Sequence, residues 1–174
     1  LGIEPTSDTA DAAEAQGVPV LREFFCSDLG SRLAKENKQA DLVLGNNVYA
    51  HVPDINDFTV GLKKVLKSRG VVTLEFPHLL RLLEENQFDT IYHEHFSYLS
   101  LHTASRIFEQ AGLKIWDVES LSTHGGSLRV YGCHSYDSRQ ISTSVQEVLA
   151  EEQSNGLKQL STYLGFQERV DRVK

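Results

Sequence analysis

The sequence has 174 residues, a length that fits one domain with room for an appendage. Lys and Arg number 17 against 24 Asp and Glu, a net charge of −7, and 40% of the residues are hydrophobic. This apolar content excludes a disordered polymer, and the acidic balance argues against a nucleic-acid partner or an anionic membrane. No apolar run approaches the roughly 20 residues of a membrane span, so a cytoplasmic protein is the default expectation.

The cysteines and the first residues bound the architecture further. Two cysteines, Cys26 and Cys133, exclude a disulfide-rich scaffold and a four-cysteine zinc site, and no metal site is predicted in this chain. Residues 1–5 resemble the tail of a strand already under way. We therefore expect an internal fragment whose first strand lies outside the sequence.

Helices and strands are predicted to alternate along the chain. The expected elements are a helix at 7–16, a strand at 18–25, a helix at 31–37, a strand at 41–45, a helix at 54–68 ended by Gly70, a strand at 71–76, helices at 79–86 and 100–111, strands at 113–119 and 127–133, and a long, mostly helical stretch at 141–172 with a break near 155–156. The compact apolar run 41–45 is typical of a strand buried on both faces.

This alternation predicts an α/β fold with a mostly parallel sheet and helices on both faces. The last two strands have no helix between them, so an antiparallel hairpin at the sheet edge is expected. A partial domain at 1–135 and a helical connector at 136–174 follow from this division. The weak apolar stripe of the terminal helix could mediate a homodimer.

Ligands bind outside the carboxyl ends of parallel strands, and these ends carry Glu4 and the segments 25–28, 45–51 and 75–78. Glu4 could accept hydrogen bonds from a ribose diol or be a solvated loop acid, and the turn Gly45, Asn46 and Asn47 could line a cofactor cleft or merely reverse the chain. Ser27 and Asp28 follow the second predicted strand.

The run 89–98 is the densest group of proton-handling side chains. Tyr92, His93, Glu94, His95 and Tyr98 lie within seven residues. They could form an acid–base site, part of a metal site or a surface loop that caps helices, and the spacing lacks the third and fourth ligands that zinc prefers. His78 and His102 flank helices, where cap or surface roles are expected.

Three runs together resemble one family. They are LGNNVYAHVPD at 44–54, FDTIYHEH at 88–95 followed by FSYLS, and HGGSLR at 124–129. In this order and spacing they are similar to class I S-adenosylmethionine-dependent C-methyltransferases that act on nucleotide-linked 4-keto-deoxysugars. The resemblance covers residues 1 to about 135 and continues into the helix beyond.

The resemblance implies a Rossmann-like sheet and assigns roles to the motif residues. His95 is the expected base that removes a proton beside the ketone, Glu94 would orient it, and Tyr92 and His51 would stabilise the enolate oxygen. The residues expected to hold S-adenosylmethionine are Glu4, Ser27, Asp28, Gly45, Asn46 and Asn47. His124 and Arg129 would contact the sugar nucleotide.

The sequence departs from this family in two ways. Its members carry a glycine-rich loop after the first strand and an N-terminal four-cysteine zinc module, and neither is in this chain, so zinc is expected only in the parent protein. Alternatives are therefore another class I O- or N-methyltransferase, or a catalytically inert fragment. A nicotinamide oxidoreductase fits the expected terminal hairpin less well.

Overall fold

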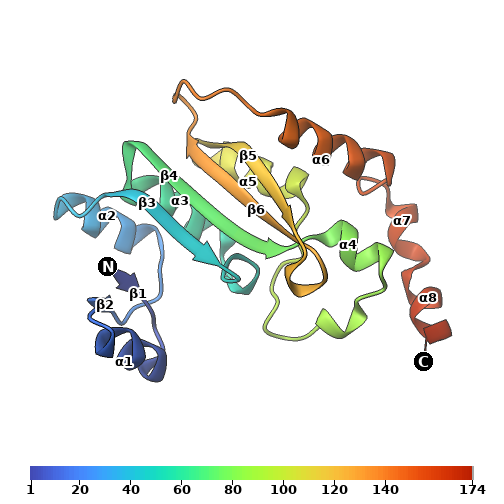
Figure 1. Cartoon of the computed structure of the whole chain (residues 1–174), viewed down its shortest axis with the longest axis horizontal. Coiled ribbons are helices and arrows are strands. Elements are labelled where there is room, and N and C mark those ends of the chain that lie inside the picture. The colour runs from blue at the N-terminus through green and yellow to red at the C-terminus, as the bar shows by residue number, and fades with distance from the viewer. Residues whose placement is uncertain (174) are drawn as a thin grey trace.

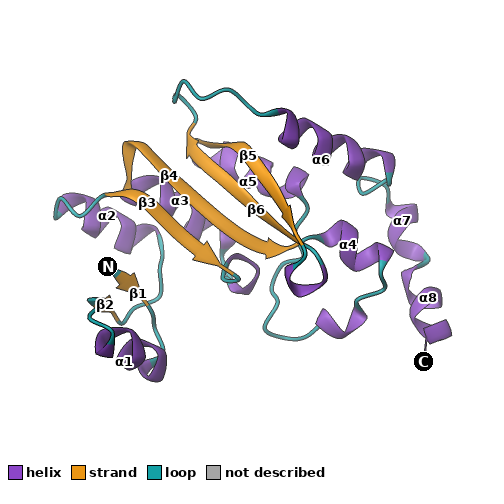
Figure 2. Ribbon diagram, viewed as in Figure 1, coloured by secondary structure: helices purple, strands orange, loops and turns teal. Residues whose placement is uncertain are grey.

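The computed structural model describes residues 1–173 and contains two sheets (Figures 1 and 2). In the smaller one, β1 (Gly2–Ile3) pairs in parallel with β2 (Val20–Leu21). The larger has the order β3-β4-β6-β5, formed by β3 (Ala40–Asn46), β4 (Leu66–Pro77), β5 (Leu113–Leu121) and β6 (Ser127–His134). β3 and β4 are parallel, whereas β6 is antiparallel to both of its neighbours. The predicted terminal hairpin is confirmed, with β5 at the edge.

Eight α-helices and three short 3₁₀ turns connect and extend these strands within residues 1–173. The helices are α1 (Ser7–Ala15), α2 (Ser27–Lys35), α3 (Ile55–Val65), α4 (Leu79–Glu84), α5 (Leu101–Ala111), α6 (Thr143–Ser154), α7 (Leu160–Leu164) and α8 (Phe166–Val173), and the 3₁₀ turns are η1 (Tyr49–His51), η2 (Phe88–Thr90) and η3 (Thr123–Gly125). The long terminal helix is in fact three helices. The first break is at the predicted place, where Gly156 adopts a φ of 71°.

The main core lies between the four-stranded sheet and helices α3 and α5, which Figure 1 shows behind it. Phe76, Phe108 and Leu128 are fully buried there. α5 is well delimited, because the Ser100 hydroxyl accepts the Thr103 amide at its start and Gly112 adopts a left-handed φ of 81° at its end. Burial of these aromatic and aliphatic side chains is the main force that fixes the sheet.

The opposite face of β3 contradicts the expectation of burial on both faces. Leu42 and Leu44 are 53% and 69% exposed, and in Figures 1 and 2 no helix of residues 1–173 lies in front of β3 and β4. The expectation of helices on both faces is therefore wrong for the described part of the chain.

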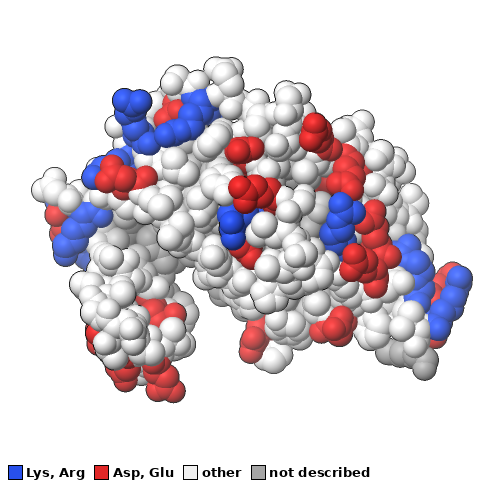
Figure 3. All heavy atoms as spheres, viewed as in Figure 1, with Lys and Arg blue, Asp and Glu red and all other residues white. Residues whose placement is uncertain are grey.

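Several predicted boundaries also shift. The strand expected at 18–25 is only two residues long, and the helix expected at 54–68 ends at Val65. Gly70 does not end that helix but lies inside β4, where a Cβ would come within 2.7 Å of Leu66. Charged side chains of both signs are interspersed on the face shown in Figure 3.

Candidate functional site

The turn that follows β3 carries the first part of the site. Asn47 adopts a left-handed φ of 53°, and its amide donates to the Glu75 carbonyl over 2.9 Å. The next residues form η1, in which the Tyr49 ring is fully buried and its hydroxyl lies 2.7 Å from the Thr59 hydroxyl. This anchor fixes His51 at the end of η1, close to the carboxyl end of the sheet.

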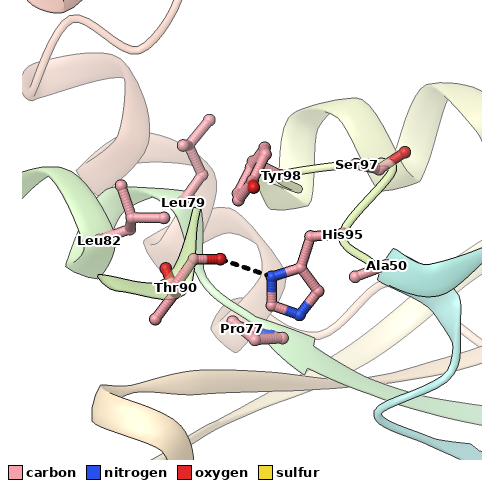
Figure 4. A pocket seen from close by; sticks show the side chains of 8 residues that line it. All are labelled: Ala50, Pro77, Leu79, Leu82, Thr90, His95, Ser97 and Tyr98. Atoms are coloured by element: carbon pink, nitrogen blue, oxygen red, sulfur yellow. Dashed lines mark hydrogen bonds between the residues drawn. The ribbon is translucent and has the colours of Figure 1, made fainter. Parts of the chain in front are cut away.

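The second part of the site is the segment 91–98, which follows η2. His95 Nδ1 lies 2.8 Å from the Thr90 carbonyl oxygen (Figure 4), and His95 Nε2 lies 3.1 Å from the Tyr92 hydroxyl. The ring centroid of His51 is 4.6 Å from that of His95, and Tyr98 contacts the same ring edge-on. Three of the four predicted catalytic residues, His51, Tyr92 and His95, are thus brought together.

The hydrogen bonds define which nitrogen of His95 is free. A carbonyl oxygen can only accept, so Nδ1 carries the proton that is donated to Thr90. Nε2 is then the basic nitrogen, and the Tyr92 hydroxyl donates to it. Thr90 was missed in the sequence because its contribution is a backbone carbonyl, which no side-chain pattern reveals.

A small pocket lies against His95. Figure 4 shows its lining residues, which are Ala50, Pro77, Leu79, Leu82, Thr90, His95, Ser97 and Tyr98. The Ala50 carbonyl accepts hydrogen bonds from the amides of Phe96 and Ser97, at 2.9 and 3.1 Å, and so ties η1 to the segment 91–98. The mostly apolar lining keeps bulk water away from the imidazole on that side.

Glu94, the fourth predicted catalytic residue, is not joined to this arrangement by any hydrogen bond or ion pair among residues 1–173. Its side chain is exposed and makes no hydrogen bond or ion pair with His95 in the described chain. The contact that orients His95 is the Thr90 carbonyl, so an orienting role for Glu94 stays a prediction.

The loop that joins β5 to β6 brings His124 to the turn after β3. His124 Nε2 lies 3.1 Å from Asn47 Nδ2, and both residues adopt left-handed φ angles. The Gly125 carbonyl accepts from the Gln87 side chain over 2.6 Å. A residue predicted for the cofactor and one predicted for the substrate therefore meet.

Arg129 is held by acidic neighbours on the sheet. Its guanidinium lies 2.9 Å from the carboxylate of Glu75, a residue only 5% exposed, and 3.5 Å from that of Glu119. Thr123 donates to the other oxygen of Glu75 over 3.0 Å. Hydrogen bonding to Glu75 raises the pKa of Arg129 above its ordinary value. A substrate contact by Arg129 stays a prediction. The sequence placed Glu75 at the carboxyl end of a strand, but its contacts with Arg129 and Thr123 were not predicted.

The other predicted cofactor residues lie at the ends of β1, β3 and the loop before α2. Glu4 follows β1, and hydrogen bonds from Thr6 to its Oε1 lower the pKa of this carboxyl. Ser27 begins α2, where its amide donates to Asp57 over 3.1 Å, and Asp28 is exposed in the first helical turn. Gly45 packs so closely that a Cβ would lie 2.8 Å from Leu74, which gives this glycine a packing role.

These residues fit the charge pattern of S-adenosylmethionine. The Asn47 side-chain oxygen is buried without a partner among residues 1–173, so it can accept from an ammonium group. The ionised Glu4 presents a second acceptor suited to a ribose diol. Asn46 is exposed beside Asn47.

Two kinds of feature are absent from residues 1–173. No group of three or more His, Cys, Asp or Glu is arranged to hold a metal ion. No helix in this range has the length and apolar content to cross a membrane.

Solved structures share this fold. A SAM-dependent methyltransferase from Thermotoga maritima superposes with a TM-score of 0.55 at 18% identity, covering 76% of this chain and 72% of that one. An O-methyltransferase of neocarzinostatin biosynthesis, solved with S-adenosylmethionine, gives 0.53 at 15% identity over 73% and 36% of the two chains. At such identities the likeness establishes the fold alone.

Sequence relatives are more specific. The C-methyltransferase NovU of Streptomyces niveus is 37% identical over the whole chain, which spans 41% of that relative's length. The model of a C-methyltransferase C-terminal domain matches residues 122–174. The model of a methyltransferase domain matches residues 5–118, more than half of the sequence. The chain therefore belongs to the methyltransferase domain family.

Proposed function

We propose that this chain takes part in S-adenosylmethionine-dependent methylation of a carbon atom beside the ketone of a nucleotide-linked 4-keto-deoxysugar. The observation that carries the proposal is the hydrogen-bonded array Thr90, His95 and Tyr92 beside His51. Oxygen and nitrogen acceptors already have lone pairs, whereas a carbon beside a ketone becomes nucleophilic only after a proton is removed. A positioned base next to hydroxyl and imidazole donors suits that requirement.

The chemistry of proton removal follows from the two nitrogens of His95. Nε2 takes the proton from the carbon beside the ketone, the C–H bond breaks, and its electron pair forms the enolate with negative charge on the keto oxygen. The ring becomes an imidazolium, and its Nδ1–H continues to donate to the Thr90 carbonyl oxygen, which stabilises the positive charge.

Tyr92 and His51 stabilise the opposite charge. The Tyr92 hydroxyl, which donates to His95 Nε2 in this structure, turns to the enolate oxygen as negative charge develops there. His51 lies against the same imidazole and offers a second donor. η1 and the segment 91–98 keep both groups next to His95, so the Tyr92 hydroxyl needs only to exchange its bond with Nε2 for one with the enolate oxygen.

S-adenosylmethionine, when bound, supplies an electrophilic methyl group on a sulfonium sulfur. Glu4, Asn46 and Asn47 are proposed to hold it, with Ser27 and Asp28 near its adenine. The relative named as a C-methyltransferase supports carbon as the acceptor. The keto-deoxysugar rests on the resemblance of the motifs at 44–54, 88–95 and 124–129, with His124 and Arg129 as sugar-nucleotide contacts.

Deuterium exchange tests the proposal. The full-length protein is incubated in D₂O with a nucleotide-linked 4-keto-6-deoxysugar, with and without S-adenosylmethionine, and the sugar is read by mass spectrometry and NMR. We expect a new C-methyl group and, without the methyl donor, deuterium beside the ketone. His95→Gln should reduce both by about a hundredfold or more, since general-base catalysis contributes factors of about 10² to 10⁴.

His93→Gln serves as the matched control, because His93 lies two residues away with an exposed side chain. It should retain exchange and methylation. A methyl group on oxygen or nitrogen, or full exchange by the His95 variant, would overturn the proposal.

A further inference from the structure

Glu152, near the end of α6, is a buried acid whose burial no sequence pattern predicted. Its side chain is 1% exposed. One carboxylate oxygen accepts from His78 Nε2 over 2.9 Å and from the Leu101 amide over 2.5 Å, and the other accepts from the His102 amide over 2.9 Å. A buried carboxylate is costly unless such donors surround it, so its position is strongly specified.

The donors to Glu152 come from two separate segments. His78 directly follows β4, whereas Leu101 and His102 form the first turn of α5. His78 occupies the N-cap position of α4, as one of its two predicted roles requires, although its side chain makes no cap hydrogen bond there. The alternative surface role is wrong, since its side chain is only 3% exposed. One side chain of α6 therefore ties the end of β4 to the beginning of α5.

These same two segments both continue into the lining of the His95 pocket. Pro77 and Leu79, which flank His78, line the pocket together with Tyr98, which lies just before α5. The Leu79 amide donates to the Leu99 carbonyl over 3.0 Å, and His78 pairs with Leu99 in an isolated parallel bridge. The Glu152 contacts lie directly behind this junction.

We propose that Glu152 is a positioning residue that acts through His78 and the start of α5 to hold the segment 91–98, and with it His95, in its working geometry. Glu152 lies within the range matched by the C-methyltransferase C-terminal domain, whereas His95 lies within the range matched by the methyltransferase domain. Residues 122–174 thus support the geometry of His95, which lies within residues 5–118. The proposal rests on the proposed function only in naming His95 as the base.

Hydrogen exchange and ¹⁵N NMR of the histidine rings test this without turnover. In Glu152→Gln, one acceptor oxygen is replaced by an amide group that faces backbone donors. We expect exchange to rise about tenfold or more at Leu101, at His102 and across 91–98, as loss of a buried bond to a charged acceptor implies. The ring signals of His95 should move from one fixed tautomer towards an average of both.

Glu151→Gln is the matched control, because the neighbouring Glu151 forms a partly exposed ion pair with Arg81 at 2.7 Å. It should leave exchange across 91–98 and the His95 ring signals unchanged. If Glu152→Gln accelerates exchange only at Leu101 and His102 and leaves the His95 signals as they were, Glu152 is a helix cap and the proposal fails.

A second pair of variants covers the case in which Glu152→Gln does not fold. His78→Leu removes the side-chain donor, whereas His78→Gln retains one. We expect the leucine variant to loosen 91–98 and alter the His95 signals, and the glutamine variant to restore most of the wild-type behaviour. Unchanged His95 signals in both variants would overturn the proposal. Absence of methyl transfer by the wild-type protein, with the expected exchange changes present in the variants, would count against the proposed function alone.

Discussion

Truncation of Tyr49 tests whether the core beneath η1 supports the site. The ring is fully buried, with the ring centroids of Phe76, Phe58 and Phe108 at 5.9, 6.0 and 6.3 Å. Thr59 donates its proton to the Ile55 carbonyl over 2.6 Å, so the Tyr49 hydroxyl is the donor in its own bond with Thr59. Tyr49→Phe therefore removes one bond and leaves the Thr59 proton satisfied.

The two substitutions at Tyr49 should differ several-fold in cost. Tyr49→Phe should lower the free energy of unfolding by about 1 kcal/mol, the usual net value of one hydrogen bond. Tyr49→Ala should lower it by about 3 to 5 kcal/mol, because it also empties the volume of an aromatic ring. Urea denaturation followed by circular dichroism measures both.

Phe24→Ala provides the control, since Phe24 is 80% exposed and its loss should change stability by about 0.5 kcal/mol or less. Tyr49→Ala should also separate His51 from His95, which is visible as altered histidine ring signals. A loss below about 1.5 kcal/mol in Tyr49→Ala would refute the reasoning, because it would mean that the core closes over the missing ring without strain.

Two further changes test the backbone and the electrostatics. Gly126→Ala should lower the free energy of unfolding by about 1 to 3 kcal/mol, because φ is 110° and the new Cβ would lie 2.7 Å from Arg81. Gly17→Ala serves as the comparison, since Gly17 has a φ of 81° but nothing within 4 Å of the new Cβ. In the same urea titration it should lower the free energy of unfolding by only about 1 kcal/mol. Hydrogen bonds from Ser27 hold the pKa of Asp57 in the folded protein below its ordinary value. The ionised Asp57 therefore stabilises the fold at pH values above its pKa in the unfolded chain, and this stabilisation is lost as the pH falls through its lower pKa in the folded protein. Asp57→Asn should therefore flatten the acid side of the stability–pH curve, and an unchanged acid limb would contradict this assignment.

The resemblance of the motifs at 44–54 and 88–95 predicted that His51, Tyr92 and His95 share one site, and most of this cluster is local in sequence. Tyr92 and His95 lie on one short segment, and His51 follows a turn that could be placed at the carboxyl end of a strand. The terminal hairpin was predictable for a similar reason, since two strands without a helix between them can pair directly. Contacts between residues that are close in sequence can be predicted from local sequence patterns.

The parts that could not be predicted depend on distant partners or on the backbone. Glu75 is joined to Arg129 and Glu152 to His78 across 54 and 74 positions, and acids are normally exposed, so neither burial was evident. The apolar residues of β3 predicted a strand buried on both faces, but Leu44 is exposed among residues 1–173. An apolar sequence shows that a face is hydrophobic, and it does not show that another element covers that face.

The two buried acids also show how the halves of the chain depend on each other. Residues 75–78, at and just after the carboxyl end of β4, receive contacts from four residues of 122–174: Glu75 from Thr123 and Arg129, and His78 from the Gly126 carbonyl and Glu152. Pro77, between them, lines the His95 pocket. Because an unpaired buried carboxylate is expensive, neither end of this segment can move without disrupting contacts from 122–174. The geometry of His95 is therefore a property of both ranges together, although its sequence motif lies wholly within the first.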